Sequence, residues 1–493
     1  MTMPPLDPAD VDRGRPLVIR GATVITGDGT QVLPDTDVLI SGDRIAAVGP
    51  RLEVPDEAAE IDGARGILMP GMIDSHRHMW QTNLRGLGAD WTLSEYFVFY
   101  YLTWGKHFRP QDIHAGNLLA AVESIDAGVT TTVDWSHGLQ TVEHGEAAAD
   151  ALASTRGRFV LAYGNLLGGP WEWSAAPEFR DFIARRGAGG AGTDLLGLQL
   201  AFDVTGDPAF PERAAFEAAR ELGLRVTTHA GVWGATSDVG IQQMWDGGFM
   251  DETVTYVHSS TLSEDSYQKI AATGGTASVS AESESSAGQG YPPTWRLRRH
   301  AIPVALSQDT SVWWSGDMFN AMRATLNADR ARCHLEAHER GETVAHNELR
   351  ASDVVQWATS GGARAIGREH DLGVIAPGRK ADVVLIKNDA SPAMGPVLHP
   401  HGHVVFQAGR GDVHTVIIDG RIAKHEGRLV GVDLPAVHAA VADTIEYIRA
   451  TMGEEAWQQS LTPPLPESER IPNPYTYSAV DGRDTSARPE DPS

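Results

Sequence analysis

The stretch Pro70-Gly71-Met72-Ile73-Asp74-Ser75-His76-Arg77-His78 decides the fold of this chain. The apolar run at 66–69 leads into it and is typical of a buried strand. Because side chains alternate along a strand, His76 and His78 share a face and can present two imidazoles to one cation. Neutral imidazole is the commonest protein ligand for zinc and similar metals, so the stretch predicts a metal site at a strand end.

Three further candidate ligands also end apolar segments, namely His229 after 224–228, His258 after 254–257 and Asp309 after 302–308. Taken singly, each has an ordinary structural explanation. A histidine at a strand end is often a hydrogen-bonded rim residue, and an aspartate there is often a helix N-cap. Their common position after strands favours one joint metal site, because ligands at the carboxyl ends of several strands are the layout of a (β/α) barrel active site.

Size and charge restrict the possible classes of protein. With 493 residues the chain is too long for one small core, and we expect one large domain and a smaller one. The formal net charge of -25 argues against a nucleic-acid-binding surface. The single cysteine, Cys333, excludes an intramolecular disulfide and a cysteine-based metal site. No apolar run reaches the roughly 18 residues of a membrane span and no signal peptide is evident, so we expect a cytoplasmic protein with no membrane partner.

Two β-rich blocks flank the middle of the chain. Residues 1–65 and 371–430 contain short β-rich runs, with hairpins predicted at 37–49 and 413–423. We expect the two blocks to pair into one small β-sandwich domain, which the barrel at 66–370 interrupts.

The middle of the chain alternates strand-like and helix-like runs, as the βα units of an α/β protein should. Helices are expected at 117–127, 214–223 and 263–272. Residues 431–493 are expected to form a C-terminal helix and a proline-rich tail.

These motifs resemble the amidohydrolase superfamily, and more closely its chlorohydrolase/deaminase branch of cytosine, guanine and S-adenosylhomocysteine deaminases and triazine hydrolases. The resemblance covers roughly residues 15–430, and residues 70–78 are its most specific part. Gln81 and Leu84-Arg85-Gly86 continue that pattern. Residues 123–131 and the Gly-x-x-Ala-Asp segment at 378–382 are similar to further motifs of the family.

The resemblance implies a distorted (β/α)8 TIM barrel that carries one divalent metal ion on His76, His78, His229 and Asp309. Some subgroups of the family instead hold two metals bridged by a carboxylated lysine from strand four. The candidate for strand four, residues 196–204, contains no lysine, so a mononuclear site is expected. Zinc is the favoured metal, with iron or manganese as alternatives.

A divalent metal on such ligands can lower the pKa of its bound water to about 7 and let it attack an sp2 carbon. We expect Asp309 to accept the proton of this water while also contacting the metal. His258 is expected to polarise the substrate or to stabilise the tetrahedral intermediate, and the alternative is that it only supports the site.

The chain departs from the deaminases at strand five, where they usually have His-x-x-Glu and where that glutamate moves protons. Here the segment His229-Ala230-Gly231-Val232 ends in a valine, which cannot transfer a proton. Glu282 or Glu284 could substitute, because continued strand-like alternation would place both on one face at the barrel mouth; a solvated loop is the alternative. Of the two, we prefer Glu282 as the catalytic residue.

Aromatic residues follow several of the proposed ligands and favour a flat, cyclic substrate. Trp80, Trp233 and Trp313 each lie within a few residues of a ligand, and with Gln81 they are the expected substrate contacts. Most other aromatic residues of these segments are expected to serve packing or a subunit interface.

The sequence therefore predicts a metal-dependent hydrolase that cleaves a non-peptide carbon–nitrogen bond of a small cyclic or heteroaromatic molecule. A decarboxylase-like lyase on the same site is one alternative. A non-catalytic assembly protein is another, although such relatives typically lose metal ligands that this chain keeps. The family resemblance also implies a homo-oligomer.

Overall fold

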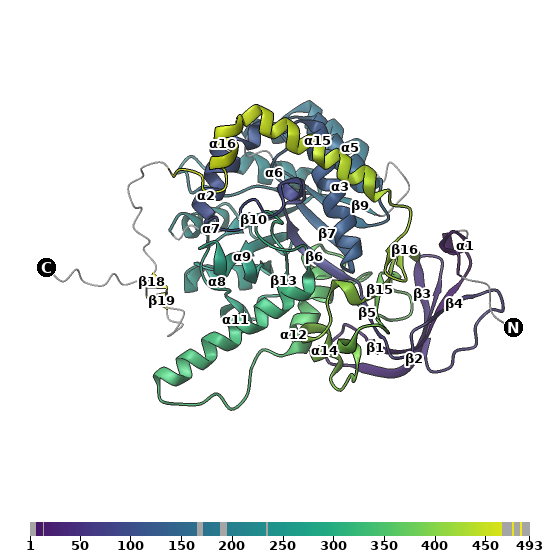
Figure 1. Ribbon diagram of the computed structural model, residues 1–493. Coiled ribbons are helices and arrows are strands. Elements are labelled where there is room, and N and C mark those ends of the chain that lie inside the picture. Colours follow the sequence, from purple (N-terminus) through teal and green to yellow (C-terminus); the bar gives the residue numbers. More distant parts are fainter. Residues whose placement is uncertain are drawn as a thin grey trace.

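The structure is a computed structural model that describes residues 6–12, 14–164, 171–187, 195–232, 235–465, 476–477 and 484–485. Trp233 and most of the proline-rich tail lie outside the described residues. The described part forms a barrel, a smaller sheet on one side of it, and a C-terminal helical segment that lies across the barrel (Figure 1).

Eight parallel strands stand side by side in chain order and form the barrel. The first and the last close the ring through two backbone hydrogen bonds, from His78 N to Asp309 O (2.7 Å) and from Asp309 N to His76 O (3.1 Å). The expected (β/α) barrel is thereby confirmed. Its strands are β6 (Met72–Arg77), β7 (Val129–Ser136), β8 (Arg158–Tyr163), β9 (Leu196–Ala201), β10 (Arg225–Ala230), β11 (Val254–His258), β12 (Thr276–Val279) and β13 (Val304–Leu306).

Helical segments connect the barrel strands, and the three helices expected from the sequence correspond, with their ends shifted by one to several residues, to α3 (Pro110–Asp126), α6 (Arg213–Leu222) and α8 (Glu264–Thr273). Helix α6 ends at Gly223, whose φ of 66° is in the left-handed region that glycine adopts without strain. Helix α8 begins after Ser263, whose side chain accepts a hydrogen bond from the backbone of Ser266. The helices after β7 to β13 are α4 (Val142–Ala153), α5 (Pro177–Gly187), α6 (Arg213–Leu222), α7 (Ala235–Asp246), α8 (Glu264–Thr273), α9 (Ala281–Ser286), α10 (Thr294–Arg299), α11 (Met318–Glu339), α12 (Ala351–Gln356) and α13 (Gly362–Ala365), with the short turns η4 (Trp171–Ala175) and η5 (Trp357–Gly361).

The two flanking blocks pair into one mixed sheet of nine strands, as expected, with its own apolar core. The hydrogen bonds join all nine strands into a single sheet, where the sequence analysis expected a sandwich. Its strands are β1 (Leu17–Ile25), β2 (Val32–Ser41), β3 (Arg44–Gly49), β4 (Ala59–Asp62), β5 (Ile67–Pro70), β14 (Val383–Ile386), β15 (Val413–Ile418), β16 (Arg421–His425) and β17 (Arg428–Leu429). Short helical segments accompany it at α1 (Pro8–Asp12), η6 (Pro392–Met394), α14 (Pro400–Phe406) and η7 (Arg410–Asp412).

The apolar run before the histidine motif belongs to this smaller sheet. Strand β5 (Ile67–Pro70) pairs with β1 and β14, and the barrel begins only at Met72, after Gly71. This differs from the expectation that the barrel starts at 66. A fully apolar run identifies a buried strand, but its composition does not say which of two adjoining sheets the strand enters.

A buried ion pair joins the smaller sheet to the barrel. Arg158 on β8 donates two hydrogen bonds to Asp382, at 2.9 Å and 3.0 Å, and both side chains are almost fully buried. The backbone of Gly71 also donates to the Asp382 carbonyl (2.9 Å). The Ala-Asp motif near the end of the chain therefore holds the junction between the two parts.

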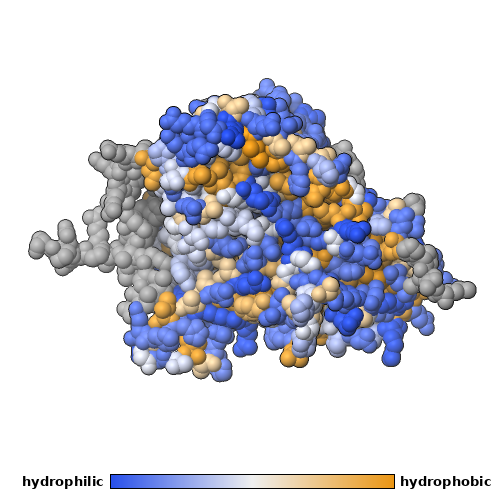
Figure 2. All heavy atoms as spheres, viewed as in Figure 1, coloured by the Kyte–Doolittle hydropathy of each residue, from blue (hydrophilic) through white to orange (hydrophobic). Residues whose placement is uncertain are grey.

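The segment after β6 forms the aromatic wall over the barrel mouth. It contains η1 (Met79–Leu84), α2 (Leu93–Phe97), η2 (Val98–Thr103) and η3 (Gly105–His107) before helix α3 (Pro110–Asp126). Helices α15 (Leu434–Met452) and α16 (Glu454–Gln459) follow the smaller sheet, and α15 packs on α3, where Thr444 donates to Asp112 (3.0 Å). Figure 2 shows apolar side chains gathered below α15 on this face. No helix in the described ranges is long and apolar enough to cross a membrane.

Candidate active site

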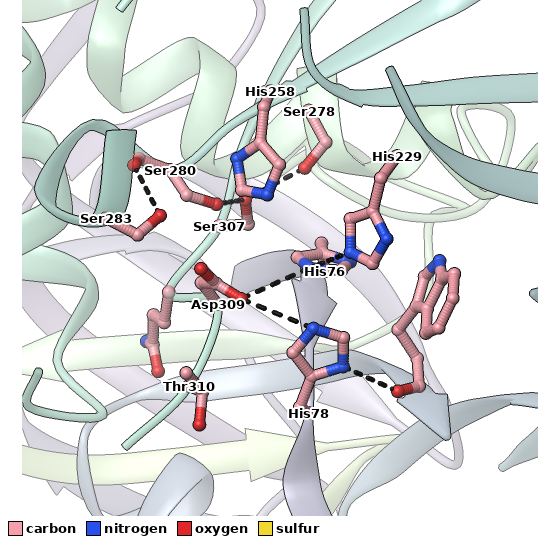
Figure 3. Close-up of polar contacts among 12 residues, drawn as sticks. His76, His78, His229, His258, Ser278, Ser280, Ser283, Ser307, Asp309 and Thr310 are labelled. Atoms are coloured by element: carbon pink, nitrogen blue, oxygen red, sulfur yellow. Dashed lines mark hydrogen bonds and ion pairs between the residues drawn. The ribbon is translucent and has the colours of Figure 1, made fainter. Parts of the chain in front are cut away.

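Five side chains converge at the carboxyl end of the barrel strands (Figure 3). His76 lies on β6 and His78 directly follows it, while His229 and His258 lie on β10 and β11 and Asp309 follows β13. These are the five residues that the sequence analysis grouped. The structure brings them together because parallel strands deliver their carboxyl ends to one rim of a barrel.

The ligand atoms are close enough to share one cation. Nε2 of His76 and Nε2 of His78 lie 3.4 Å and 3.5 Å from Oδ1 of Asp309, and Nε2 of His229 lies 3.3 Å from Nε2 of His76. His258 places a ring nitrogen within 4.8 Å of those of His76 and His229. All five side chains are buried or nearly so.

Acceptors behind the histidines fix which ring nitrogen faces inward. Nδ1 of His78 donates to the carbonyl oxygen of Trp135 (2.8 Å), and Nδ1 of His229 donates to Oδ1 of Asp203 (2.8 Å). Because a carbonyl or carboxylate oxygen can only accept, Nδ1 carries a proton in both rings, and the neutral form of each ring has its lone pair on Nε2. Their Nε2 lone pairs therefore point at the common centre, in the arrangement that proteins use to orient metal-binding imidazoles.

The donor set fits a divalent cation. The inward Nε2 atoms of His76 and His229 face each other at 3.3 Å, and Oδ2 of Asp309 is buried with no hydrogen-bond partner among the described residues. A cation at this centre would satisfy the lone pairs and the carboxylate together. Three imidazoles and one carboxylate form a nitrogen and oxygen donor set that suits zinc, iron or manganese.

The protonation states also suit metal binding. Burial lowers the pKa of His76 well below its ordinary value and lowers that of His78 to about 4, so both rings are neutral at pH 7. For Asp309, burial raises the pKa, but the contacts with the surrounding histidines outweigh burial and hold the pKa well below its ordinary value, so the carboxyl is ionised. Neutral imidazole and ionised carboxylate are the forms that bind a metal.

Two of the converging residues have a strained backbone. The φ angles of His258 and Asp309 are 69° and 60°, in the left-handed region that side chains with a Cβ rarely adopt. Such conformations persist only where the surrounding structure fixes them, and they cluster at functional sites. Here both residues with this backbone conformation place their side chains at the shared centre.

Hydroxyl groups support the rim from below. Ser307 Oγ lies 2.9 Å from Ser278 Oγ and 2.5 Å from Ser280 Oγ (Figure 3). Ser278 Oγ also lies 2.7 Å from Ser75 Oγ. The chain of buried hydroxyls crosses β6, β12 and the segment after β13. It ties together the strand ends that carry His76 and Asp309.

A cavity of about 320 Å³ opens above the converging side chains. Its lining is largely aromatic and apolar and includes Leu93, Phe97, Tyr101, Val204, Val232 and Trp313. Tyr96, Asp203, Thr205 and Gln289 add polar groups, and the described lining contains no lysine or arginine. The cavity therefore suits a small, flat molecule without a negative charge.

Of the expected substrate contacts within the described residues, one lines the cavity and two lie behind its lining. Trp313 lines the cavity, whereas Trp80 is fully buried against Tyr100 and Phe108 and does not line it. Gln81 is buried beneath the wall, where it accepts a hydrogen bond from Thr310 (2.8 Å) and donates one to the Tyr96 hydroxyl (2.8 Å). Trp80 and Gln81 thus support the site from behind, because the turn after His78 directs them into the protein.

The two candidate glutamates point in different directions. Residues 281–286 form helix α9, so side chains two positions apart diverge, and the expected strand-like alternation was wrong. Glu284 reaches His258, with 3.3 Å between Oε1 and Nδ1. Glu282 does not line the cavity; burial and the charge of Asp317 raise its pKa to about 7.

Three supporting residues were missed by the sequence analysis. Asp203 follows β9 and holds His229, and Tyr96 lines the cavity with its hydroxyl 3.4 Å from Nε2 of His137. His137 directly follows β7, so the same strand-end signal could have found it. Asp203 also follows a strand closely, so its position gave the same signal. Its contact with His229, however, forms only because the two strands that precede and carry these residues lie side by side.

A divalent-metal hydrolase with a (β/α) barrel is the class that this fold and donor set define. The model of the amidohydrolase family matches residues 67–423, and the chain belongs to this family. It is a metal-dependent hydrolase that acts on carbon–nitrogen bonds other than peptide bonds.

Curated relatives and solved structures agree with this assignment. A 5-methylthioadenosine/S-adenosylhomocysteine deaminase of Desulfitobacterium hafniense is 30% identical over 421 residues, which cover 82% of this chain and 92% of the relative. A zinc-bound adenosine deaminase structure from Xanthomonas campestris has a TM-score of 0.73 at 22% identity, covering 88% of this chain and 98% of its own. The zinc complex of an atrazine chlorohydrolase from Arthrobacter aurescens has a TM-score of 0.71 at 22% identity, covering 88% and 100%. The resemblance to the chlorohydrolase/deaminase branch is thus confirmed.

Proposed function

We propose that this hydrolase uses one metal ion, held by His76, His78, His229 and Asp309, to release ammonia or an amine from a small, uncharged heteroaromatic or cyclic molecule. The observation that carries the proposal is the convergence of three inward Nε2 atoms and the Asp309 carboxylate beneath an aromatic-walled cavity. Strand four contains no lysine, which supports one metal ion over a bridged pair. Zinc is favoured because the structures of two similar enzymes contain it.

A cation bound at this centre supplies an activated water by lowering the pKa of that water toward neutrality. Asp309 accepts a proton from the water as its oxygen bonds to the sp2 carbon of the substrate. Nε2 of His258 faces the same centre and accepts a hydrogen bond from the attacking water or from the nitrogen that leaves, which stabilises the positive charge that develops on that group. The carbon–nitrogen bond then breaks, its electron pair stays on nitrogen, and nitrogen takes up a proton, so one water is consumed for each amine released.

The cavity restricts the charge of the substrate. Two carboxylates, Asp203 and Asp309, line the described cavity, and no cationic side chain balances them there. A carboxylate or phosphate on a part of the substrate away from the metal centre would lose hydration without gaining a lysine or arginine partner from the described lining. We therefore infer that a neutral or cationic ring with apolar substituents binds, with Trp313, Tyr101 and Phe97 as its aromatic contacts.

Leaving-group protonation does not use position 232 in this chain. Val232 lines the cavity near His229, in the place where related deaminases have a glutamate, and valine has no proton to give. A substrate whose leaving group departs readily, or one whose leaving nitrogen receives from Asp309 the proton that Asp309 took from the water, fits this site. Ring deamination and cleavage of a cyclic amide both meet this condition.

The experiment that tests the function is a screen of metal-loaded protein against aminoheterocycles, cyclic amides and aryl amides, following ammonia and mass together. Ammonia release with a gain of about one mass unit would establish ring deamination. Addition of water or cleavage without ammonia would establish amide hydrolysis. Loss of carbon dioxide from a carboxylated ring would contradict the proposal.

The cytoplasmic location and the homo-oligomeric state that the sequence implied stay predictions of this proposal. The negative net charge of -25 and the single cysteine are compatible with a reducing compartment. Light scattering on the purified protein measures the oligomeric state directly.

A further inference from the structure

His258 and Glu284 form a buried pair at the edge of the cavity. Nδ1 of His258 lies 3.3 Å from Oε1 of Glu284, and the two side chains are 2% and 0% exposed. The same Oε1 accepts a hydrogen bond from the backbone of Ser280 (2.8 Å), where strand β12 passes into helix α9. Glu284 is therefore held on one side by the backbone and contacts the imidazole on the other.

The hydrogen bonds determine the direction of this contact. Because Oε1 already accepts the Ser280 N–H, it acts as an acceptor, and the proton between the two side chains belongs to Nδ1 of His258. The argument holds for either charge state of Glu284, since a proton on a neutral carboxyl would lie on Oε2. That atom is buried and has no partner among the described residues.

His258 thereby completes a pattern shared by three histidines of the rim. His78 and His229 each donate from Nδ1 to an oxygen behind them and turn Nε2 inward. The ring of His258 is nearly parallel to that of His229, with 5.5 Å between centroids and 9° between planes. The backbone of His258 is in the left-handed region, a conformation that persists only where the surrounding structure fixes it, and Glu284 is the side chain that contacts the ring at Nδ1.

We propose that Glu284 is a positioning residue, which holds His258 in the tautomer and orientation that present a bare Nε2 to the reacting group. The proposal rests on the proposed function for the reaction itself. The tautomer that it assigns to His258 does not depend on turnover. It replaces the expectation that Glu282 acts at the site, because Glu282 does not line the cavity.

The first test is spectroscopic and does not need a substrate. The full-length, metal-loaded protein, labelled with ¹⁵N at histidine, reports the tautomer of each ring, and the signal that His258→Ala removes identifies His258. We expect the Nδ1-protonated form in wild type and in Glu284→Gln, whose amide oxygen can accept from both Ser280 and His258. Glu284→Ala should lose that preference. An unchanged tautomer in Glu284→Ala would overturn the proposal.

The second test is a double-mutant cycle on a substrate found in the screen. We expect Glu284→Ala to lower kcat about tenfold or more with KM changed less than about threefold, and Glu284→Gln to retain most of kcat. In a His258→Ala background, Glu284→Ala should cost less than about twofold, since its effect passes through His258. Equal losses in both backgrounds, or equal losses in the alanine and glutamine variants, would overturn the proposal.

Glu282→Gln is the matched control, because it removes a carboxyl two residues away on the same helix that does not line the cavity. Its kcat should stay within about twofold of wild type. If wild type turns over none of the substrates, the proposed function fails, and the spectroscopic test still decides the role of Glu284.

Discussion

Replacing Asp203 with alanine should weaken metal binding without touching a metal ligand. Oδ1 of Asp203 accepts a hydrogen bond from Nδ1 of His229 (2.8 Å) and a second one from the His229 backbone (3.2 Å). Burial lowers the pKa of His229, but the carboxylate of Asp203 outweighs burial and raises the pKa overall. Without Asp203 the ring can rotate or present the other tautomer, so the bare Nε2 is no longer fixed toward the centre.

The expected loss of metal affinity follows from the type of hydrogen bond that Asp203→Ala removes. A hydrogen bond to a charged group stabilises by about 1.5–3 kcal/mol, and its loss behind a metal-binding histidine weakens metal binding about 10- to 100-fold. The Asp203 side chain is 26% exposed, so water partly replaces it and the lower half of this range applies. We therefore expect Asp203→Ala to raise the metal Kd about 10- to 30-fold.

The assay is competition for zinc between the protein and a chromophoric chelator at pH 7.5. Asp203→Asn should lose less affinity than Asp203→Ala, because the amide oxygen can still accept from Nδ1. Asp207→Asn, an exposed position in the same loop, is the control and should bind as wild type does. A Kd of Asp203→Ala within about twofold of wild type would refute the claim that this carboxylate orients His229.

The remaining predictions concern stability and leaving-group chemistry. Glu123→Ala should destabilise the fold by about 3–5 kcal/mol in urea unfolding, since it leaves Arg77 buried without its carboxylate partner; a loss below about 1 kcal/mol would contradict this. Glu282→Gln should become more stable relative to wild type between pH 5 and pH 8, by about 1–3 kcal/mol. Burial raises the pKa of Glu282 to about 7, so the protonated Glu282 carboxyl contributes its full stability below the ordinary pKa of 4.5, and this stability is lost as the pH rises through 7. A difference in unfolding free energy between the two proteins that does not change with pH would speak against the shift. Val232→Glu should raise kcat/KM for an aminoheterocycle at least about tenfold over Val232→Gln by supplying the missing proton donor, and equal rates in the two variants would show that another group already does so.

The sequence was sufficient to predict the barrel and to group the five residues of the rim. Each of His76, His229 and His258 lies at or near the end of an apolar strand, and the carboxyl ends of parallel strands meet at one rim. The flanking hairpins were likewise predictable, because Ser41-Gly42-Asp43 is a turn signal between two β-rich runs.

Other features depend on information that local patterns do not contain. Residues 281–286 follow a strand and were expected to continue its alternation, but they turn into a helix, and this reverses which glutamate faces the site. Trp80 lies two residues after a ligand, yet the turn at η1 directs it into the core. Asp203 and His229 meet only because β9 and β10 pair in register, with Thr227 opposite Ala201.

The measurement that tests the central claim most directly is a crystal structure of the zinc-loaded protein, with anomalous data collected on both sides of the zinc edge. The account predicts one anomalous peak per chain, within bonding distance of Nε2 of His76, His78 and His229 and of the Asp309 carboxylate. Zinc–nitrogen contacts should be about 2.0–2.1 Å. Two peaks at the rim, or a single peak away from these four side chains, would contradict it.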